Sequence, residues 1–382
     1  MKKAFLVFVF LLLVSIHISF AQAGPGHLRI SVLTCAPGDE LYSIFGHTAL
    51  RITDSIQHTD LVYNYGTFDF DDPDFYTKFV RGKLNYFLSV EELPSFLYEY
   101  QVTKRNVIEQ ELLLNDHSKL AIKNALSQNL VGNNRYYKYD FLYDNCTSRV
   151  KDILIKYAGM KVDKKLAPQG TSFRDMIHEY LDRGHRKWTK LGMDILLGSP
   201  SDKAVSINES MFLPDYLLKG IDSTISTNNA LLMKKQYVLT TGYGENHTHT
   251  NWPMYIFTGI AVVILLVSFM RNERARILTR QFDFLLFFVT GLVGLLLLFT
   301  WFGTDHMSFA NNYNLFWALP TNILTAFMLW KNPARLKRYF FACSVMYGLL
   351  LALWFWLPQQ LNPAFIPLVL VLLSRSARLA KA

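Results

Sequence analysis

A histidine and a cysteine lie in local sequences that suit a thiol nucleophile and its general base. His47 opens an apolar and β-branched run, residues 48–53, that predicts a strand. Cys146 follows the turn-forming Asn145 and opens residues 146–158, where the spacing of apolar side chains predicts a helix. A thiol is nucleophilic as the thiolate, which a helix N-terminus and a nearby imidazole both stabilise. The pattern therefore points to acyl transfer through a cysteine.

Such a pair needs a third polar group to orient the imidazole and hydrogen-bond donors for the oxyanion. Asn64 lies in the next predicted strand, 60–65, and an antiparallel hairpin with 48–53 brings it close to His47. His58 is the alternative, but it lies in the predicted hairpin turn. We expect the backbone amides of the first helical turn near Cys146 to hold the oxyanion.

These residues also have purely structural interpretations. A buried cysteine is often inert, a strand histidine is often a core residue, and Cys35 can instead pair with Cys146 in a disulfide if the domain is exported. Other candidate sites are weaker, because His247 and His249 lack a third metal ligand nearby and the acidic loop 69–74 lacks the spacing of a calcium site. We expect neither a metal nor another cofactor.

Apolar stretches divide the chain. Two lysines, an apolar run and small residues within 1–23 are typical of a signal peptide, with an uncleaved anchor as the alternative. An exported domain then covers 24–250 and ends in a polar linker, 223–251. Residues 251–382 form a transmembrane domain, because about 20 apolar residues cross a hydrocarbon core of about 30 Å. The predicted spans are 252–270, 282–302, 314–330, 339–357 and 360–376.

Basic residues set the orientation of these spans. Loops 271–281 and 331–338 and the C-terminal tail hold eleven Lys and Arg residues, whereas loops 303–313 and 358–362 hold none. Loops rich in Lys and Arg stay in the cytoplasm, so the N-terminal domain is outside and the C-terminus inside. The same cations explain the net charge of +9, so nothing indicates a nucleic-acid partner.

The exported domain is predicted to be of the α+β class. Residues 28–114 show mainly strand patterns, and helices are predicted over 115–129, 146–158 and 172–182. Past residue 186 the helical pattern weakens.

The order of a histidine, a polar residue on the next strand and a cysteine at a helix start resembles the circularly permuted NlpC-type papain-like hydrolases. That group includes the LRAT-like acyltransferases, which take acyl chains from phospholipids through a cysteine thioester. The resemblance rests on His47, Asn64 and the Asn145–Cys146 pair. It implies a permuted papain-like (NlpC/LRAT-like) exported domain, followed here by an all-α transmembrane bundle of about five helices.

A closer resemblance is to the Lnb lipoprotein N-acyltransferase family. It is carried by residues 34–51, 63–70, 143–149 and 191–198, and it extends into the multi-span region. The resemblance implies catalytic roles for Cys146 and His47, with Asn64 as the orienting residue inferred above. It also implies that four residues support the site or bind substrate: Asn145, Tyr42, Gly46 and Arg51.

The reaction that this resemblance implies is the last step of lipoprotein maturation. An acyl chain moves from a phospholipid donor to the N-terminal amine of a diacylglyceryl-cysteine lipoprotein, in the inner membrane and with the catalytic domain in the periplasm. A membrane-anchored cysteine peptidase or amidase acting on cell-wall peptides is the alternative enzyme, and a scaffold or sensor with a degenerate domain is the non-enzymatic one. Five spans favour lipid substrates over a soluble peptide.

Overall fold

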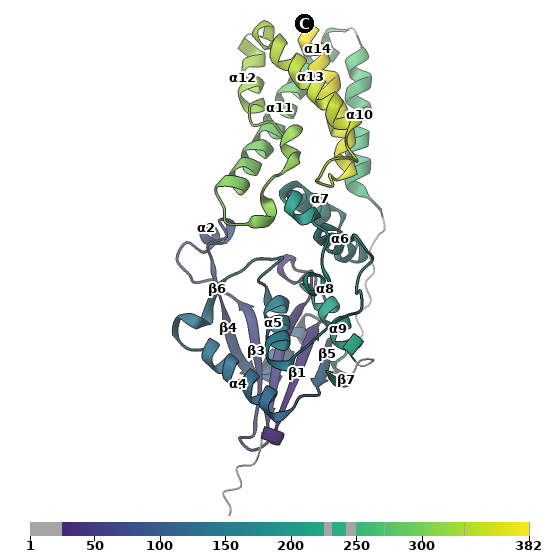
Figure 1. Cartoon of the computed structure of the whole chain (residues 1–382). Coiled ribbons are helices and arrows are strands. Elements are labelled where there is room, and N and C mark those ends of the chain that lie inside the picture. The colour runs from purple at the N-terminus through teal and green to yellow at the C-terminus, as the bar shows by residue number, and fades with distance from the viewer. Residues whose placement is uncertain (1–24, 225–230, 242–249, 271, 332, 382) are drawn as a thin grey trace, which may run out of the picture.

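The computed structural model describes residues 25–224, 231–241, 250–270, 272–331 and 333–381 (Figure 1). The predicted signal peptide, His247 and His249 lie outside the described residues. An α+β domain stands at one end of a helical bundle, and helices of the domain lie between its sheet and the bundle (Figure 1).

The described part of the N-terminal domain is built on one seven-stranded antiparallel sheet with the order β6-β4-β3-β2-β1-β5-β7. The predicted strands at 48–53 and 60–65 are confirmed. The strands are β1 (Leu28–Cys35), β2 (His47–Asp54), β3 (Thr59–Thr67), β4 (Asn85–Glu92), β5 (Val107–Leu112), β6 (Tyr136–Lys138) and β7 (Leu232–Leu239).

Helices cover both faces of this sheet because its strands alternate apolar side chains between the two faces. Val150 and Leu154 pack with Leu50 and Ile52 on one face, whereas Phe96 packs with another set of strand residues on the other. The helices of the domain are α2 (Phe75–Val80), α3 (Leu93–Val102), α4 (Asp116–Asn129), α5 (Cys146–Ala158), α6 (Phe173–Arg183), α7 (Lys187–Leu196), α8 (Ile207–Ser210) and α9 (Pro214–Ser223).

The interpretation of 223–251 as a linker is wrong for residues 232–239, which form β7 and complete the sheet beside β5. The segment 231–239 has three polar residues among its nine, and every residue of β7 is half-buried or exposed. No residue of β7 is fully buried, so the strand lacks the alternation of apolar and polar side chains that a strand with one packed face shows, and the local pattern did not reveal it.

The bundle contains three helices that are long and apolar enough to cross a membrane, among the described residues: Trp252–Phe269, Glu273–Phe302 and Pro363–Lys381. They correspond to α10, α11 and α14 (Ile366–Lys381) with the short helix before it. The predicted spans 314–330 and 339–357 are broken or shortened, giving α12 (Asn322–Lys331) and α13 (Lys337–Ala352). Pro320 explains the first break, because the residue before a proline avoids helical geometry.

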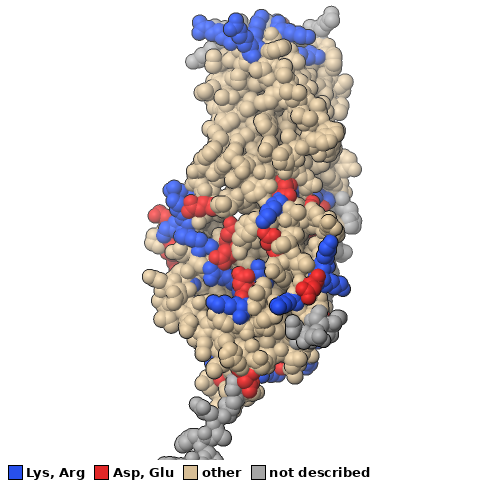
Figure 2. Space-filling model, viewed as in Figure 1, with Lys and Arg blue, Asp and Glu red and all other residues tan. Residues whose placement is uncertain are grey.

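Charge is distributed as a membrane protein requires. Figure 2 shows Lys and Arg gathered at the end of the bundle away from the domain, and a belt without charged residues between that end and the domain. With basic residues on the cytoplasmic side, this arrangement puts the domain on the outer side.

The domain is fastened to the bundle through α7. The last carbonyls of a helix lack partners within it, and in α7 they accept from side-chain amides of the bundle loops. Asn312 donates to the Ile195 carbonyl at 2.7 Å, and Gln359 donates to the Leu197 carbonyl at 2.9 Å. Leu191 of α7 packs into the bundle's hydrophobic core.

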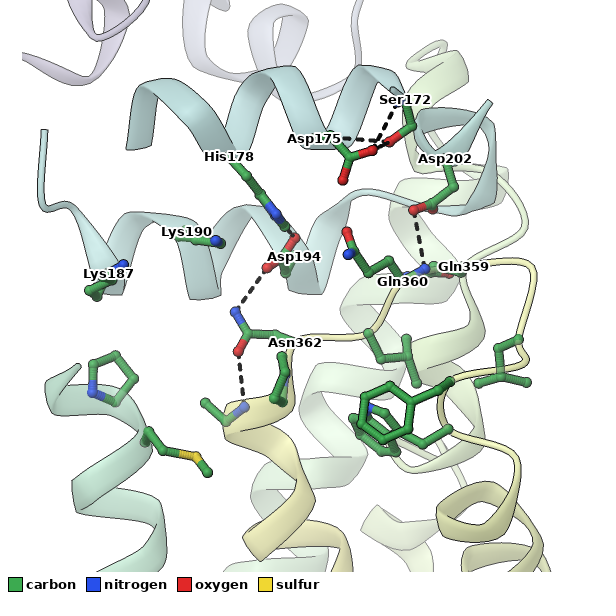
Figure 3. A pocket seen from close by; sticks show the side chains of 18 of the residues that line it. Ser172, Asp175, His178, Lys187, Lys190, Asp194, Asp202, Gln359, Gln360 and Asn362 are labelled. Carbon is green, nitrogen blue, oxygen red and sulfur yellow. Dashed lines mark hydrogen bonds and ion pairs between the residues drawn. The ribbon is translucent and has the colours of Figure 1, made fainter. Parts of the chain in front are cut away.

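A cavity of about 660 Å³ lies beside this contact, between α6 and α7 on one side and the loop before α14 on the other (Figure 3). Asp194 faces it and accepts from His178 at 2.7 Å and from Asn362 at 2.8 Å. Asp194 also pairs with the fully buried Arg174 at 2.8 Å. Asp194 is thus neutralised by partners in its own domain, and the bond from Asn362 joins this wall of the cavity to the bundle.

Candidate active site

The structure brings His47, Asn64 and Cys146 together. His47 begins β2, Asn64 lies in the neighbouring strand β3, and Cys146 begins α5. The His47 Nε2 atom lies 2.6 Å from Asn64 Oδ1, and the Cys146 side chain is close enough to the imidazole to act on the pKa of His47. Because the Asn64 oxygen accepts only, Nε2 carries the proton and Nδ1 is left to accept from the thiol.

Asn145 positions the thiol by capping α5. Its Oδ1 accepts from the Thr147 and Ser148 amides, each at 2.8 Å, and its Nδ2 donates to the carbonyls of Phe141 and Phe212. A polar N-cap of this kind fixes where the helix begins. Asn145 therefore acts on Cys146 through the backbone.

The Asn145 cap also reduces the number of backbone amides that are free to bind the oxyanion. Two of the first-turn amides, those of Thr147 and Ser148, are already bonded to Asn145. A donated hydrogen cannot serve two acceptors well at once. The first turn of α5 thus contributes the Cys146 amide at most, and a second donor has to come from elsewhere.

Electrostatics at the pair favour the charged forms. Burial raises the pKa of Cys146, but the charge of His47, the hydrogen bond with His47 and a bond from the Thr48 amide outweigh it, and the pKa falls from 9.0 to about 7. Burial lowers the pKa of His47, but the Cys146 thiolate and the bonds with Cys146 and Asn64 raise it overall. A thiolate–imidazolium pair near neutral pH is what a cysteine nucleophile needs.

Two residues of the site were missed by sequence reasoning. Glu91 of β4 lies near the Asn64 side chain, which acts on the pKa of this carboxyl. Burial raises the pKa of Glu91, which the Asn64 side chain opposes. The sequence held no signal for this contact, because it depends on how β3 pairs with β4.

The second missed residue is Tyr137 of β6. Its hydroxyl is buried and has no hydrogen-bond partner among the described residues. A Cβ atom added at Gly66 would lie 3.5 Å from Cys146 Cβ, 4.0 Å from His47 Cε1 and 4.0 Å from the Tyr137 hydroxyl, so all three groups surround one point. Burial raises the pKa of Tyr137, which keeps the hydroxyl protonated as a donor. In the sequence, the aromatic-rich run 136–143 is the local feature that could have pointed to Tyr137.

The other predicted support residues lie outside this cluster or act through the backbone. Gly46 has φ +76°, and a Cβ there would lie 2.5 Å from the Cys35 carbonyl, so the turn into His47 requires glycine. Tyr42 is 69 % exposed on the short helix Leu41–Ser43. Arg51 is four residues along β2 from His47 and pairs with Asp60 at 2.7 Å and Glu109 at 2.8 Å, so it braces the sheet.

Cys35 and Cys146 are free thiols, so the alternative of a disulfide between them is wrong. Burial raises the pKa of Cys35 to about 12. No group of three or more His, Cys, Asp or Glu side chains suited to a metal occurs in the described residues.

Comparison with family models gives two matches along the chain. Residues 18–179 match the Lnb N-terminal periplasmic domain, and residues 245–381 match the Lnb transmembrane domain, whose model is named for five transmembrane helices. The chain belongs to the Lnb family. As a member of the Lnb family it is a membrane protein with a periplasmic N-terminal domain and transmembrane helices. No curated protein and no solved structure matches the chain.

Proposed function

We propose that the protein is a lipoprotein N-acyltransferase that moves an acyl chain from a phospholipid to the N-terminal amine of a diacylated lipoprotein. The observation that carries the proposal is the low-pKa thiol of Cys146 beside His47, in a periplasmic domain fastened to a transmembrane bundle. Both substrates are lipids held in the membrane. The bundle lies in the inner membrane with the C-terminus in the cytoplasm.

The first half of the reaction forms a thioester. The Cys146 sulfur attacks the carbonyl carbon of a phospholipid ester while its proton resides on His47 Nδ1. The carbon–oxygen bond breaks, and the imidazolium donates its proton to the departing lysophospholipid oxygen. Asn64 keeps the imidazole in the required tautomer through its bond to Nε2.

The second half transfers the acyl group to nitrogen. The lipoprotein amine attacks the thioester carbonyl carbon, and His47 takes the proton that the amine loses. The carbon–sulfur bond breaks and the thiolate is restored, so an ester and an amine have become an amide and an alcohol. A thioester suits this step because amines attack it readily.

Tyr137 is the second oxyanion donor in this mechanism. Its unpartnered hydroxyl beside Cys146 supports the assignment, together with the capping of the Thr147 and Ser148 amides. An oxygen that gains negative charge in the transition state gives this buried donor the acceptor that it lacks in the resting protein.

The test is lipoprotein chemistry in cells that depend on this protein for triacylated lipoproteins. With Cys146→Ser, mass spectrometry is expected to find diacylated N-termini, whereas the matched Cys35→Ser variant keeps them triacylated. Neutral hydroxylamine is expected to release an acyl group from trapped wild-type protein. Full N-acylation in the Cys146→Ser strain would overturn the proposal, and a peptide product from cell-wall substrates would favour the peptidase instead.

A further inference from the structure

Aromatic side chains form a continuous series from α2 to the thiol. Successive ring centroids lie 6.0 Å apart for Phe79 and Phe75, 5.0 Å for Phe75 and Phe70, and 4.9 Å for Phe70 and Phe68. The series continues from Phe68 to Tyr86 at 5.4 Å, and from Tyr86 to Tyr137 at 6.4 Å. We call these residues, with Tyr76, the aromatic face.

One end of the aromatic face lies against the segment that follows the span-length helix α11. The Asp305 amide donates to the Arg81 carbonyl at 2.9 Å, and His306 Nε2 lies 3.3 Å from the Phe79 carbonyl. Asp305 and His306 follow the outer end of α11, so α2 is held against the end of a membrane-spanning helix (Figure 1).

This end is exposed although it is apolar. Phe70 is 69 % exposed, Tyr76 78 % and Phe79 50 %. Such a patch in water is unfavourable, whereas aromatic side chains are favoured at the membrane interface. The neighbouring Arg81 and Lys83 are exposed cations of the kind that meet lipid phosphates.

The other end of the aromatic face reaches the neighbourhood of the thiol. Gly66 lies in a β-bulge between Asn64 and Thr67, and the point where its side chain would begin is 3.5 Å from Cys146 Cβ. Its φ of +94° favours glycine, so the chain runs from the catalytic residues to Phe68 without a side chain beside the thiol. The segment 64–80 therefore links the candidate active site to the outer end of the bundle.

We propose that the aromatic face binds the acyl chain of an outer-leaflet phospholipid and leads its ester to Cys146. This inference rests on the proposed function, which requires a lipid ester to reach a thiol outside the membrane. Apolar chains bind such a face because both lose contact with water, and the phosphate of the lipid meets the cations beside α2.

The test uses the full-length Phe70→Ser/Tyr76→Ser double variant reconstituted in phosphatidylethanolamine–phosphatidylglycerol vesicles. Both side chains are mostly exposed, so their loss leaves the core intact. Acyl-thioester formation from vesicle phospholipid is expected to fall at least about fivefold, since two aromatic contacts with the chain are lost. Acylation by water-soluble p-nitrophenyl acetate is expected to stay unchanged. The matched control is Tyr237→Ser, which removes a 63 % exposed tyrosine from β7 at the opposite edge of the sheet.

A second readout does not need the reaction. A phosphatidylethanolamine with a diazirine in its acyl chain, added to vesicles that hold Cys146→Ala protein, is expected to crosslink within residues 68–86. Crosslinks confined to the cavity beside α7, or a double variant with the wild-type rate, would overturn the inference. A wild-type protein that forms no thioester would instead overturn the proposed function, and the crosslinks alone would then decide whether the aromatic face binds acyl chains.

Discussion

The two free thiols of the periplasmic domain lie in neighbouring regions with opposite chemistry. Cys35 ends β1 and is the register partner of His47 on β2, whereas Cys146 begins α5 beyond the same histidine. Burial raises the pKa of both, yet the pKa of Cys35 is about 12 and that of Cys146 about 7. Because burial opposes ionisation of both thiols, the contact with the imidazole and the Thr48 amide accounts for the lower pKa of Cys146.

Replacing the His47 imidazole should remove most of the pKa difference between Cys146 and Cys35, and it has the largest expected effect on activity. With His47→Ala, acyl-thioester formation is expected to fall about 10³-fold, within the range for the loss of a general base. The pKa of Cys146 is expected to rise from about 7 to 9.0 or above, because burial then acts without the opposing charge of His47. The pH dependence of alkylation by iodoacetamide measures this pKa. An unchanged alkylation profile would contradict the thiolate–imidazolium pair.

Removing the Tyr137 hydroxyl should slow the reaction and leave the thiol as it is. With Tyr137→Phe, the kcat of thioester formation is expected to fall about 10²-fold, as for the loss of one oxyanion donor, while KM stays similar. The acid limb of the pH profile near 7 is expected to be unchanged.

Asn64→Ala provides the contrast for Tyr137→Phe. The bond with Asn64 raises the pKa of His47, so its loss lowers that pKa and moves the alkaline limb, where the imidazolium loses its proton, to lower pH. A shift of either limb in the Tyr137→Phe protein would show that Tyr137 acts on the pair instead of on the oxyanion.

Cys35→Ala should have the smallest effect on activity, within about twofold, and an effect on alkaline stability. A thiol with a higher pKa in the folded than in the unfolded protein stabilises the fold below the unfolded value. In wild type that contribution is lost as pH rises from about 9.0 toward 12. Thermal melting between these pH values is expected to show a steeper loss for wild type than for the variant. Equal slopes would contradict a buried, neutral Cys35.

Local sequence was sufficient wherever a signal lies within a few residues. The strands 48–53 and 60–65 follow from alternating side chains, and the start of α5 follows from the Asn145 cap. Because a hairpin joins the two strands, the sequence also predicted the proximity of His47 and Asn64, which lie 2.6 Å apart.

Local sequence patterns did not predict the contacts between segments that lie far apart in the chain. Arg51 resembled a support residue until its partners Asp60 and Glu109 were located, and the anchoring of α7 by Asn312 and Gln359 joins segments more than a hundred residues apart. Predicted spans also assumed that an apolar stretch is one helix, which Pro320 prevents in 314–330.

The sequence by itself determined the candidate nucleophile, its base, their order and the apolar stretches that attach them to a membrane. Only the tertiary structure decided what lies around the candidate site: Tyr137 from an edge strand of three residues, Glu91 of β4 near Asn64, and the series of aromatic rings from Tyr137 to α2. The physical reason is the distance along the chain over which each kind of interaction acts. Capping and periodicity act between near neighbours in the chain, whereas strand register and helix packing bring together residues that no local pattern connects.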